Sequence, residues 1–599
     1  MEFIAHNFVP LLFAGLLLFL LTGFPVAFSL AATGLTFGLI GMEAGLFQKT
    51  LFQALPLRIF GIMQNDTLLA VPFFTFMGII LERSGMAEDL LETVGQVFGQ
   101  LRGGLALATI FVGALLAATT GVMAAAVISM GLISLPIMLR CGYNRSIATG
   151  VITASGTLAQ AIPPSLVLIV MADQLGRSVG DMYAGAIVPG LMLVGLYALF
   201  IVVLAIFRPG WVPALPQDAL IYREANGASG RKSLLAILTI ATAAAFAWSF
   251  LHDGVMNPLM DREGSAPMDE ILILSMTVAA FFALALALAN RWLHLGLLSQ
   301  LSQRVVFVLL PPLVLIFLVL GTIFLGIATP TEGGAMGATG ALIMAIGRRR
   351  LDFELLKQAL DNTAKLSCFV MFILIGATVF SFTFNAADGH VFVEGLFQKL
   401  PGGQMGFLIA VNLLVFVLGC FIDFFEIAFI VIPLLVVVAE KMGINLVWFG
   451  VMIAMNLQSS FLTPPFGFAL FYLRSVAPWV DYNDRVTNQR IKAVTTAQIY
   501  KGSIIFIILQ LTMLAAVIAF PNLVTDRLDK APKVNLESII LEAETGDYGK
   551  QAEDPMEALV PQQSATDKTA QEAGGAAQEE DPMEAVKRAI EQEAKNKKP

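Results

Sequence analysis

Apolar runs long enough to cross a bilayer recur along most of the chain, and they constrain its fold more than any other feature. Examples are residues 186–207, 233–251, 271–290, 305–325 and 502–520. A helix of about 20 apolar residues matches the thickness of the hydrocarbon core. Only 13% of the 599 residues are charged, against about a quarter in soluble proteins. We therefore predict an all-α polytopic membrane protein.

Signs of catalysis are missing from the sequence. The three cysteines and four histidines are scattered: Cys141, Cys368, Cys420, His6, His252, His294 and His390. None of them forms the spacing of a transition-metal site, and no HExxH, Walker or GxSxG motif occurs. We predict that the protein is not an enzyme and uses no cofactor.

The distribution of Lys and Arg predicts an orientation, because cytoplasmic segments are enriched in positive charge. Segments 83–104, 139–146, 208–232, 291–305, 348–365 and 473–501 carry 20 Lys and Arg and are assigned to the cytoplasm. Segments 42–65, 173–185, 253–270, 385–406 and 439–445 carry 6 and are assigned outside. With this orientation both termini lie outside. Within the cytoplasmic segments, residues 87–101 and 353–365 are amphipathic and are expected to lie in the membrane interface as arms.

The same orientation requires two apolar stretches, residues 105–138 and 407–438, to enter and leave on one side. Each is interrupted midway by small or polar residues, at 118–121 and 419–423. Non-helical backbone at membrane depth survives only where protein or a water-filled cavity satisfies it. We therefore predict two re-entrant hairpins with buried tips. The alternative is a pair of ordinary transmembrane helices joined by a tight turn.

The two hairpins belong to an internal repeat. Each is followed by a Gly and then by a helix that is broken at a Pro-Pro pair, with 21 positions from Gly142 to Pro163 and again from Gly443 to Pro464. Five spanning helices in each half place the second half upside down relative to the first, so the repeat is inverted. The predicted organisation is a first repeat at 1–232 (hairpin 105–138, broken helix 147–172), an inserted transmembrane pair at 233–303, a second repeat at 304–523 (hairpin 407–438, broken helix 446–472) and an acidic, mostly disordered tail at 524–599.

Inverted repeats with broken helices are typical of secondary transporters, since freed carbonyls can coordinate a cation and half-helix N-termini can face an anion. Asp423 is the strongest candidate ligand, because an ionisable group in an apolar hairpin is costly unless it serves an ion or a partner. Its alternative role is structural hydrogen bonding, which we also consider for Glu426. For Glu332 we favour scaffold stabilisation. The Pro-Pro pairs could be simple kinks, and the repeated EDPMEA at 553–558 and 580–585 is either solvated tail or a docking motif.

Four stretches resemble the large membrane subunit of tripartite ATP-independent periplasmic (TRAP) transporters: 156–165 (GTLAQAIPPS), 326–337 (GIATPTEGGAMG), 350–360 (RLDFELLKQAL) and 419–433. The resemblance runs from about residue 9 to 523, apart from 233–303. It implies sodium-coupled, elevator-type import of an organic acid across the bacterial inner membrane. It also implies two partners, a small four-helix membrane subunit and a periplasmic binding protein, with no role for nucleic acid.

The resemblance further implies where sodium and substrate bind. One sodium site would use Thr119, Thr120, Gly121, Ser155, Gly156 and Thr157, and the other would use Gly419, Cys420, Asp423, Ser459, Ser460 and Thr463. The substrate carboxylate would lie between the hairpin tips, at Thr120, Pro163, Pro164, Ser165, Pro464 and Pro465. Cys420 would contribute its main-chain carbonyl, because a hard cation prefers oxygen to a thiol.

Three other functions remain open at this point. A stand-alone sodium- or proton-coupled carboxylate carrier would need no binding protein. An intramembrane enzyme would need a nucleophile and a base on facing helices, which we do not find. An ion channel would need a continuous pore, to which two hairpins with asymmetric polar residues are poorly suited.

Overall fold

The chain is almost entirely helical in a computed structural model that describes residues 6–48, 50–121, 123–216, 222, 230–259, 264–293, 298–399, 401–484, 487–526 and 528. Residues 529–599, which form most of the acidic tail and contain both EDPMEA copies, lie outside these residues. Within the described part, the one sheet is a two-stranded antiparallel hairpin of β1 (Tyr482–Asn483) and β2 (Arg490–Ile491).

The elements follow the apolar pattern of the sequence. Those before residue 220 are α2 (Phe8–Leu21), α3 (Val26–Glu43), η1 (Leu51–Ala54), α4 (Leu55–Met63), η2 (Asp66–Leu69), α5 (Ala70–Arg83), α6 (Met86–Phe98), α7 (Gly104–Thr120), α8 (Met123–Arg140), α9 (Arg145–Thr157), η3 (Leu158–Gln160), α10 (Leu166–Gln174), α11 (Val179–Phe207) and η4 (Pro209–Trp211). Those after it are α12 (Arg231–Leu259), α13 (Met268–Trp292), α14 (Gln300–Phe324), α15 (Pro330–Gly347), α16 (Phe353–Ala386), α17 (Gly389–Gln398), α18 (Gly403–Gly419), α19 (Phe424–Glu426), the π-helix η6 (Ile427–Val431), α20 (Ile432–Lys441), α21 (Leu446–Ser460), α22 (Phe468–Val476), α23 (Thr496–Ala519) and α24 (Asn522–Thr525).

Eight described helices are long and apolar enough to cross a membrane, or nine if a bent pair counts as one span. The pair is Leu51–Met63 with Asp66–Arg83, bent by 46°. The protein is therefore an all-helical polytopic membrane protein. This number of candidate spans is lower than the prediction of five spans in each half plus an inserted pair. The reason is that several helices next to turns and breaks are too short to count, such as α2 and α21.

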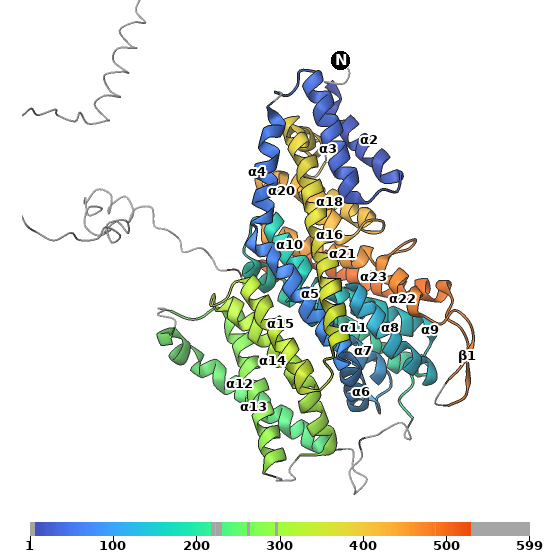
Figure 1. Ribbon diagram of the computed structural model, residues 1–599. Helices are drawn as coiled ribbons and strands as arrows, with labels where there is room; N and C mark the ends of the chain where they lie inside the picture. Colours follow the sequence, from blue (N-terminus) through green and yellow to red (C-terminus); the bar gives the residue numbers. More distant parts are fainter. Residues whose placement is uncertain are drawn as a thin grey trace, which may run out of the picture. The chain divides into compact units, whose positions relative to one another are not determined.

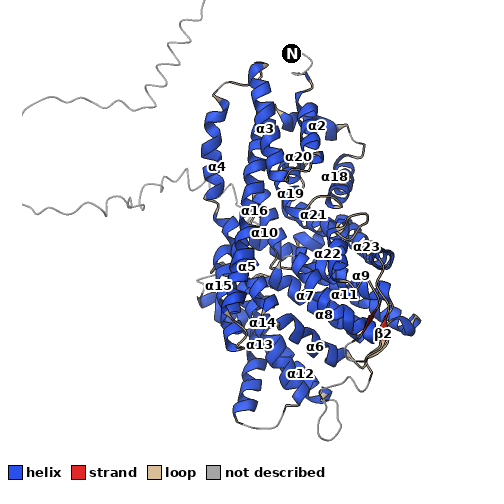
Figure 2. Cartoon of the chain, turned by 45° about the vertical axis from the view of Figure 1, so that its right-hand side comes forward, coloured by secondary structure: helices blue, strands red, loops and turns tan. Residues whose placement is uncertain are grey.

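The helices pack in two groups. In the first, α3 lies along α16 and α5 lies along α15, with α14 beside α15 (Figure 1). In the second, α9 packs on α7, α8 and α23, and α21 packs on α18 and α23 (Figure 2). Contacts of α7 with α5 and α6 join the two groups. We call them the α16 group and the α9 group.

Close helix contact in the α16 group depends on glycine. A Cβ at Gly34 of α3 would lie 2.6 Å from the carbonyl oxygen of Val379 on α16, which is a backbone atom that cannot rotate away. The Thr383 hydroxyl donates to the Gly34 carbonyl at 2.7 Å. Small residues at such crossings let helices approach closely in a membrane.

Two stretches differ from the sequence-based prediction. Residues 353–365 were expected to form a separate arm in the membrane interface, but they are the start of the continuous 34-residue helix α16. Asp352 caps this helix by accepting from the Leu355 N–H at 2.7 Å. The helix ends at Ala386, shortly before Asp388, which has φ +52°. Residues 51–63 were expected in an outer loop and instead form η1 and α4.

Candidate functional site

The first hairpin, α7 and α8, turns at Gly121, which adopts φ +59°. Its N–H donates to the Ala117 carbonyl at 3.1 Å. A Cβ at Gly121 would lie 3.1 Å from Leu166 Cγ, so glycine lets the turn pack against the start of α10. The side chains of Thr119 and Thr120 lie outside the described residues, so their predicted roles as ligands stay predictions.

Two helices are interrupted where the sequence analysis placed the breaks. The first is interrupted between α9 and α10 and the second between α21 and α22. Each interruption contains its Pro-Pro pair, with Pro163-Pro164 and Pro464-Pro465 both cis. The first break is buried, and Ser165 in it donates to the Gln160 carbonyl at 3.1 Å. The second is more open, with Pro465 exposed.

Hydroxyl groups gather where α9 and α21 end. Each donates to a main-chain carbonyl of its own segment: Ser155 to Ile152 (3.0 Å), Thr157 to Ala154 (2.9 Å), Ser459 to Asn456 (2.6 Å), Ser460 to Leu457 (2.9 Å) and Thr463 to Ser459 (2.8 Å). A hydroxyl that donates its proton keeps its oxygen lone pairs as acceptors. These oxygens are thus suited to a hard cation such as Na⁺.

The hairpins pack on the broken helices through matching contacts. Gly113 of α7 lies against the Ser155 side chain, and Gly419 of α18 lies against the Ser460 side chain. A Cβ on either glycine would collide with its serine. Gly156 in turn packs on Val127 of α8. In both halves a glycine of the hairpin therefore lies against a serine near the end of the broken helix.

Buried amides connect the two broken helices. Gln458 Nε2 donates to the Thr157 carbonyl at 2.8 Å, and Gln510 Nε2 donates to Thr157 Oγ1 at 3.2 Å and to Tyr197 OH at 2.6 Å. Asn456 Nδ2 donates to the carbonyl and side-chain oxygens of Asn412. The side-chain oxygens of Gln458, Gln510 and Asn456 are buried and have no hydrogen-bond partner in the described structure.

Unpaired buried oxygens are costly, since a desolvated acceptor without a partner loses about 1–3 kcal/mol. A bound cation would supply what they lack. The sequence analysis missed Gln510, Asn412 and Asn456, because each is a lone amide within an apolar helix. That isolation was the available signal: a polar side chain deep in a spanning helix usually has a partner on another helix.

The second hairpin turns at Asp423. Its N–H donates to Glu426 Oε2 at 3.1 Å, and η6 follows directly as one π-helical turn. Such π-bulges often occur at functional sites. Cys420 is buried, and its thiol donates to the Phe416 carbonyl at 3.3 Å. Its main-chain carbonyl oxygen is a harder ligand for a cation than its sulfur. Glu426 thus has the structural role considered for it, as a cap on the Asp423 N–H.

Glu332 has the kind of role that the sequence suggested. Its carboxylate accepts from the Thr329 N–H at 2.8 Å and from the Thr329 hydroxyl at 3.0 Å, which caps the start of α15. Thr331 beside it donates to the Asp66 carbonyl at 2.6 Å and so ties α15 to η2. Both contacts lie within the α16 group.

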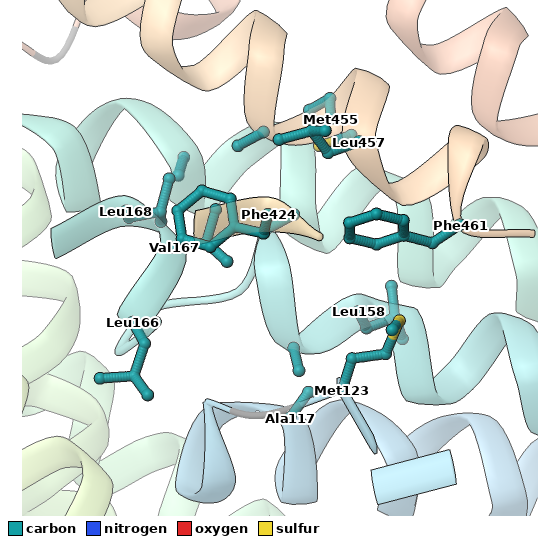
Figure 3. Packing of buried hydrophobic residues seen from close by; sticks show 14 of the residues in the cluster. Ala117, Met123, Leu158, Leu166, Val167, Leu168, Phe424, Met455, Leu457 and Phe461 are labelled. Carbon is teal, nitrogen blue, oxygen red and sulfur yellow. The ribbon is translucent and has the colours of Figure 1, made fainter. Parts of the chain in front are cut away.

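Both hairpin turns and both breaks meet in one buried cluster. Figure 3 shows Ala117 and Met123 of the first hairpin near Leu158 of the first break, and Phe424 of the second hairpin near Val167 of α10. Contacts of η3 with α7 and α21, and of α10 with α19, agree with this view. No group of three His, Cys, Asp or Glu suited to a metal ion occurs among the residues that the structure describes.

A cavity of about 450 Å³ opens beside the second hairpin turn. Its walls come from α2 and α3, α16, the turn itself and α22: Leu20, Phe24, Val26, Phe369, Phe421, Ile422, Asp423, Glu426, Phe468 and Tyr472. The cavity therefore lies between the α16 group and the α9 group. Phe369 is halfway along α16, so the cavity lies at the level of the middle of that helix.

An ion pair outside the apolar segments joins the two halves of the chain. Asp484, in the β1–β2 turn, accepts from Arg140 Nε at 2.9 Å and Nη2 at 2.8 Å, at the end of the first hairpin. It also accepts from the N–H and hydroxyl of Thr487, each at 2.8 Å. The hydrogen bonds from Arg140 hold the pKa of Asp484 well below its usual value. The carboxylate is only 3% exposed.

Comparison with known proteins identifies the family of this chain. The Pseudomonas aeruginosa C4-dicarboxylate TRAP transporter large permease protein DctM is 27% identical over 432 residues, which is 72% of this chain and 82% of the relative. The Vibrio cholerae sialic acid TRAP transporter large permease protein SiaM is 24% identical and covers 76% of this chain and 87% of the relative. The Oleidesulfovibrio alaskensis isethionate TRAP transporter permease protein DctMQ is 25% identical, over 78% of this chain and 60% of the relative.

Among solved structures, the Alcanivorax borkumensis YdaH transporter aligns with a TM-score of 0.44 and 13% identity, over 79% of this chain and 88% of that one. This likeness is too low to support an argument. The family model of the DctM component, by contrast, matches residues 13–237 and 296–523. The unmatched stretch between them contains all of α13 and most of α12. The chain therefore belongs to the DctM component family of tripartite ATP-independent periplasmic transporters, which are membrane transporters and not enzymes.

Proposed function

We propose that the chain imports a small organic acid together with sodium ions, and that a periplasmic binding protein delivers the acid. The observation that carries this proposal is the buried network between the broken helices, in which Gln458 and Gln510 meet at Thr157. It leaves several buried oxygens available to a cation. Oxygen ligands of this kind suit Na⁺.

The two sodium sites would be those expected from the sequence. The first uses the Gly121 turn with the end of α9, including Ser155, Gly156 and Thr157. The second uses the turn at Asp423 with the end of α21, including Ser459 and Ser460. The contacts of Gly113 with Ser155 and of Gly419 with Ser460 support this assignment, since they bring each hairpin to its broken helix.

The substrate carboxylate would bind between the hairpin turns, next to the two breaks. The N-terminal end of α10 lies against the Gly121 turn, and α22 begins just after the second break. Helix N-termini attract anions. Ser165 and the Pro464-Pro465 pair border the proposed carboxylate site. The names of relatives are consistent with an anionic substrate, because they name a C4-dicarboxylate, sialic acid and isethionate.

Transport would follow an elevator mechanism in an inverted repeat. The α9 group, which carries both hairpins and both breaks, would move against the α16 group. The cavity beside Asp423 supports this division, because its walls come from both groups. The chain would lie in the inner membrane with both termini outside, as the charge distribution predicts, and a small four-helix membrane subunit would complete the assembly.

Sodium-driven uptake in proteoliposomes tests the proposal. Asp423→Ala should abolish sodium-dependent uptake of the substrate, while purified yield and melting temperature stay close to those of the wild type. Uptake that keeps its sodium dependence would remove Asp423 from the site. Omitting the binding protein separates the tripartite system from a stand-alone carrier, since a stand-alone carrier would transport equally well without it.

A further inference from the structure

The cavity beside the second hairpin turn has an unusual lining for a site that takes an organic anion. Aromatic rings line it from four elements: Phe24, Phe369, Phe421, Phe468 and Tyr472. The polar side chains in its lining are Asp423, Glu426 and the phenol of Tyr472, and none of its lining residues is Lys, Arg or His.

The cavity is not simply a lipid-facing surface. It holds two carboxylate side chains, and ionisable groups inside a membrane protein face the protein interior or a water-filled space. Its walls belong to the two groups of helices that would move against each other. At about 450 Å³ it falls in the range of small-molecule sites, which is roughly 300–1,000 Å³.

The rings extend from the cavity toward the second break. Phe421 of the turn and Phe466 of the break pack with their ring centroids 5.6 Å apart. Phe421 is 54% exposed and Phe466 is 63% exposed. The pair therefore offers free ring surface beside Asp423 and Pro465, where the substrate would arrive.

The charges in the cavity limit how many negative groups a substrate can carry. One carboxylate can be neutralised by a sodium ion and by a half-helix N-terminus. Even with a sodium ion at Asp423, a second carboxylate would lie next to Glu426 with no cationic side chain in the lining to pair with, and like charges in a confined site repel. The remainder of the substrate would meet aromatic surface.

We propose that the transported acid is a monocarboxylate with an aromatic body, and that its ring packs on Phe421 and Phe466. This inference depends on the proposed function, because it places the ring of the substrate beside the second hairpin turn and the second break, which border the proposed carboxylate site. It differs from the C4-dicarboxylates named for the relatives. Aromatic acids satisfy both features of the cavity at once, a single negative charge and a flat apolar ring.

Binding to the purified full-length chain in nanodiscs tests the inference. Radiolabelled benzoate and succinate are measured at saturating sodium, and ²²Na⁺ binding is measured separately. Benzoate should bind at least about ten-fold more tightly than succinate. Phe421→Ala should weaken benzoate binding by about three- to ten-fold, the value of one lost aromatic contact, and Phe421→Tyr should restore it. Neither variant should change the affinity for ²²Na⁺.

A matched control is available on α12. Phe246 and Phe250 also form an exposed pair, with centroids 5.0 Å apart, but neither lines the cavity. Phe246→Ala should leave benzoate binding unchanged. Tighter binding of succinate, or equal losses in Phe421→Ala and Phe246→Ala, would overturn the aromatic assignment and leave sodium binding intact. Absence of sodium-dependent binding of both acids, with ²²Na⁺ binding unaffected by Asp423→Ala, would instead refute the proposed function.

Discussion

The ion pair between Arg140 and Asp484 allows the loss of stability in one variant to be worked out from the structure. Replacing Asp484 with Asn keeps the shape of the side chain but removes its charge. Four hydrogen bonds reach this carboxylate, two of them from Arg140. Hydrogen bonds to a charged group contribute about 1.5–3 kcal/mol each when buried. Arg140 is 29% exposed, so solvent screens the pair and we expect a loss of about 1–2 kcal/mol.

The pH dependence of this loss follows from the sign of the pKa shift. Because the pKa of Asp484 is lowered in the folded protein, its stabilising effect is complete above the unfolded value of about 3.9. It is lost only as the pH falls through the lowered folded value. The difference in stability between the wild type and Asp484→Asn should therefore be constant from pH 8 to pH 5.

Thermal unfolding of the purified chain in detergent measures this difference, and Asp481→Asn provides the control. Asp481 lies in the same loop and pairs with Arg490 at 3.2 Å, but Arg490 is 76% exposed. This control should melt within error of the wild type. The reasoning would be wrong if both variants lost the same stability, or if the effect of Asp484→Asn disappeared between pH 8 and pH 6.

Three further predictions follow from other contacts. Gly34→Ala should destabilise the chain by about 1–3 kcal/mol through overpacking against Val379. Gly61→Ala should not, because a Cβ at Gly61 would have open space around it. Equal melting temperatures of the two variants would contradict this prediction. Gln458→Leu should weaken ²²Na⁺ binding by at least about ten-fold, since a buried hydrogen bond and a free oxygen are lost together; unchanged binding would exclude Gln458 from the sodium network. Deleting residues 530–599 should leave uptake near normal, and a large loss would show that the acidic tail takes part in transport.

Much of the fold could be predicted from local sequence signals. A continuous apolar run specifies a membrane helix because backbone groups in lipid must pair within their own segment. The Pro-Pro pairs specify breaks, since proline lacks the N–H that continues a helix. In the structure the helices are interrupted at both Pro-Pro pairs, and the chain turns at Gly121 and at Asp423; that the two turns are re-entrant in the membrane stays a prediction. The start of α16 was misplaced, because a change from amphipathic to apolar character does not end a helix that has no Gly, Pro or capping residue there.

The candidate site was harder to predict from the sequence than the fold, because its contacts depend on tertiary structure. Asp423 could be selected from the sequence, because an ionisable residue inside a membrane is rarely neutral in function, whereas Ser155, Thr157 and Ser459 were expected from the family resemblance. The sequence could not show that Gln458 reaches Thr157, since that contact joins residues about 300 positions apart. It depends on how the two halves pack.

Hydropathy by itself determined that this chain is an all-helical polytopic protein, and helix breakers predicted two hairpins and two interrupted helices, because those signals act within a few residues. Only the tertiary structure decided which glycine faces which serine, which amide oxygens stay unpaired and which rings surround Asp423. The physical reason is that these properties belong to surfaces formed by helices distant in sequence, and close packing, not local propensity, selects their partners.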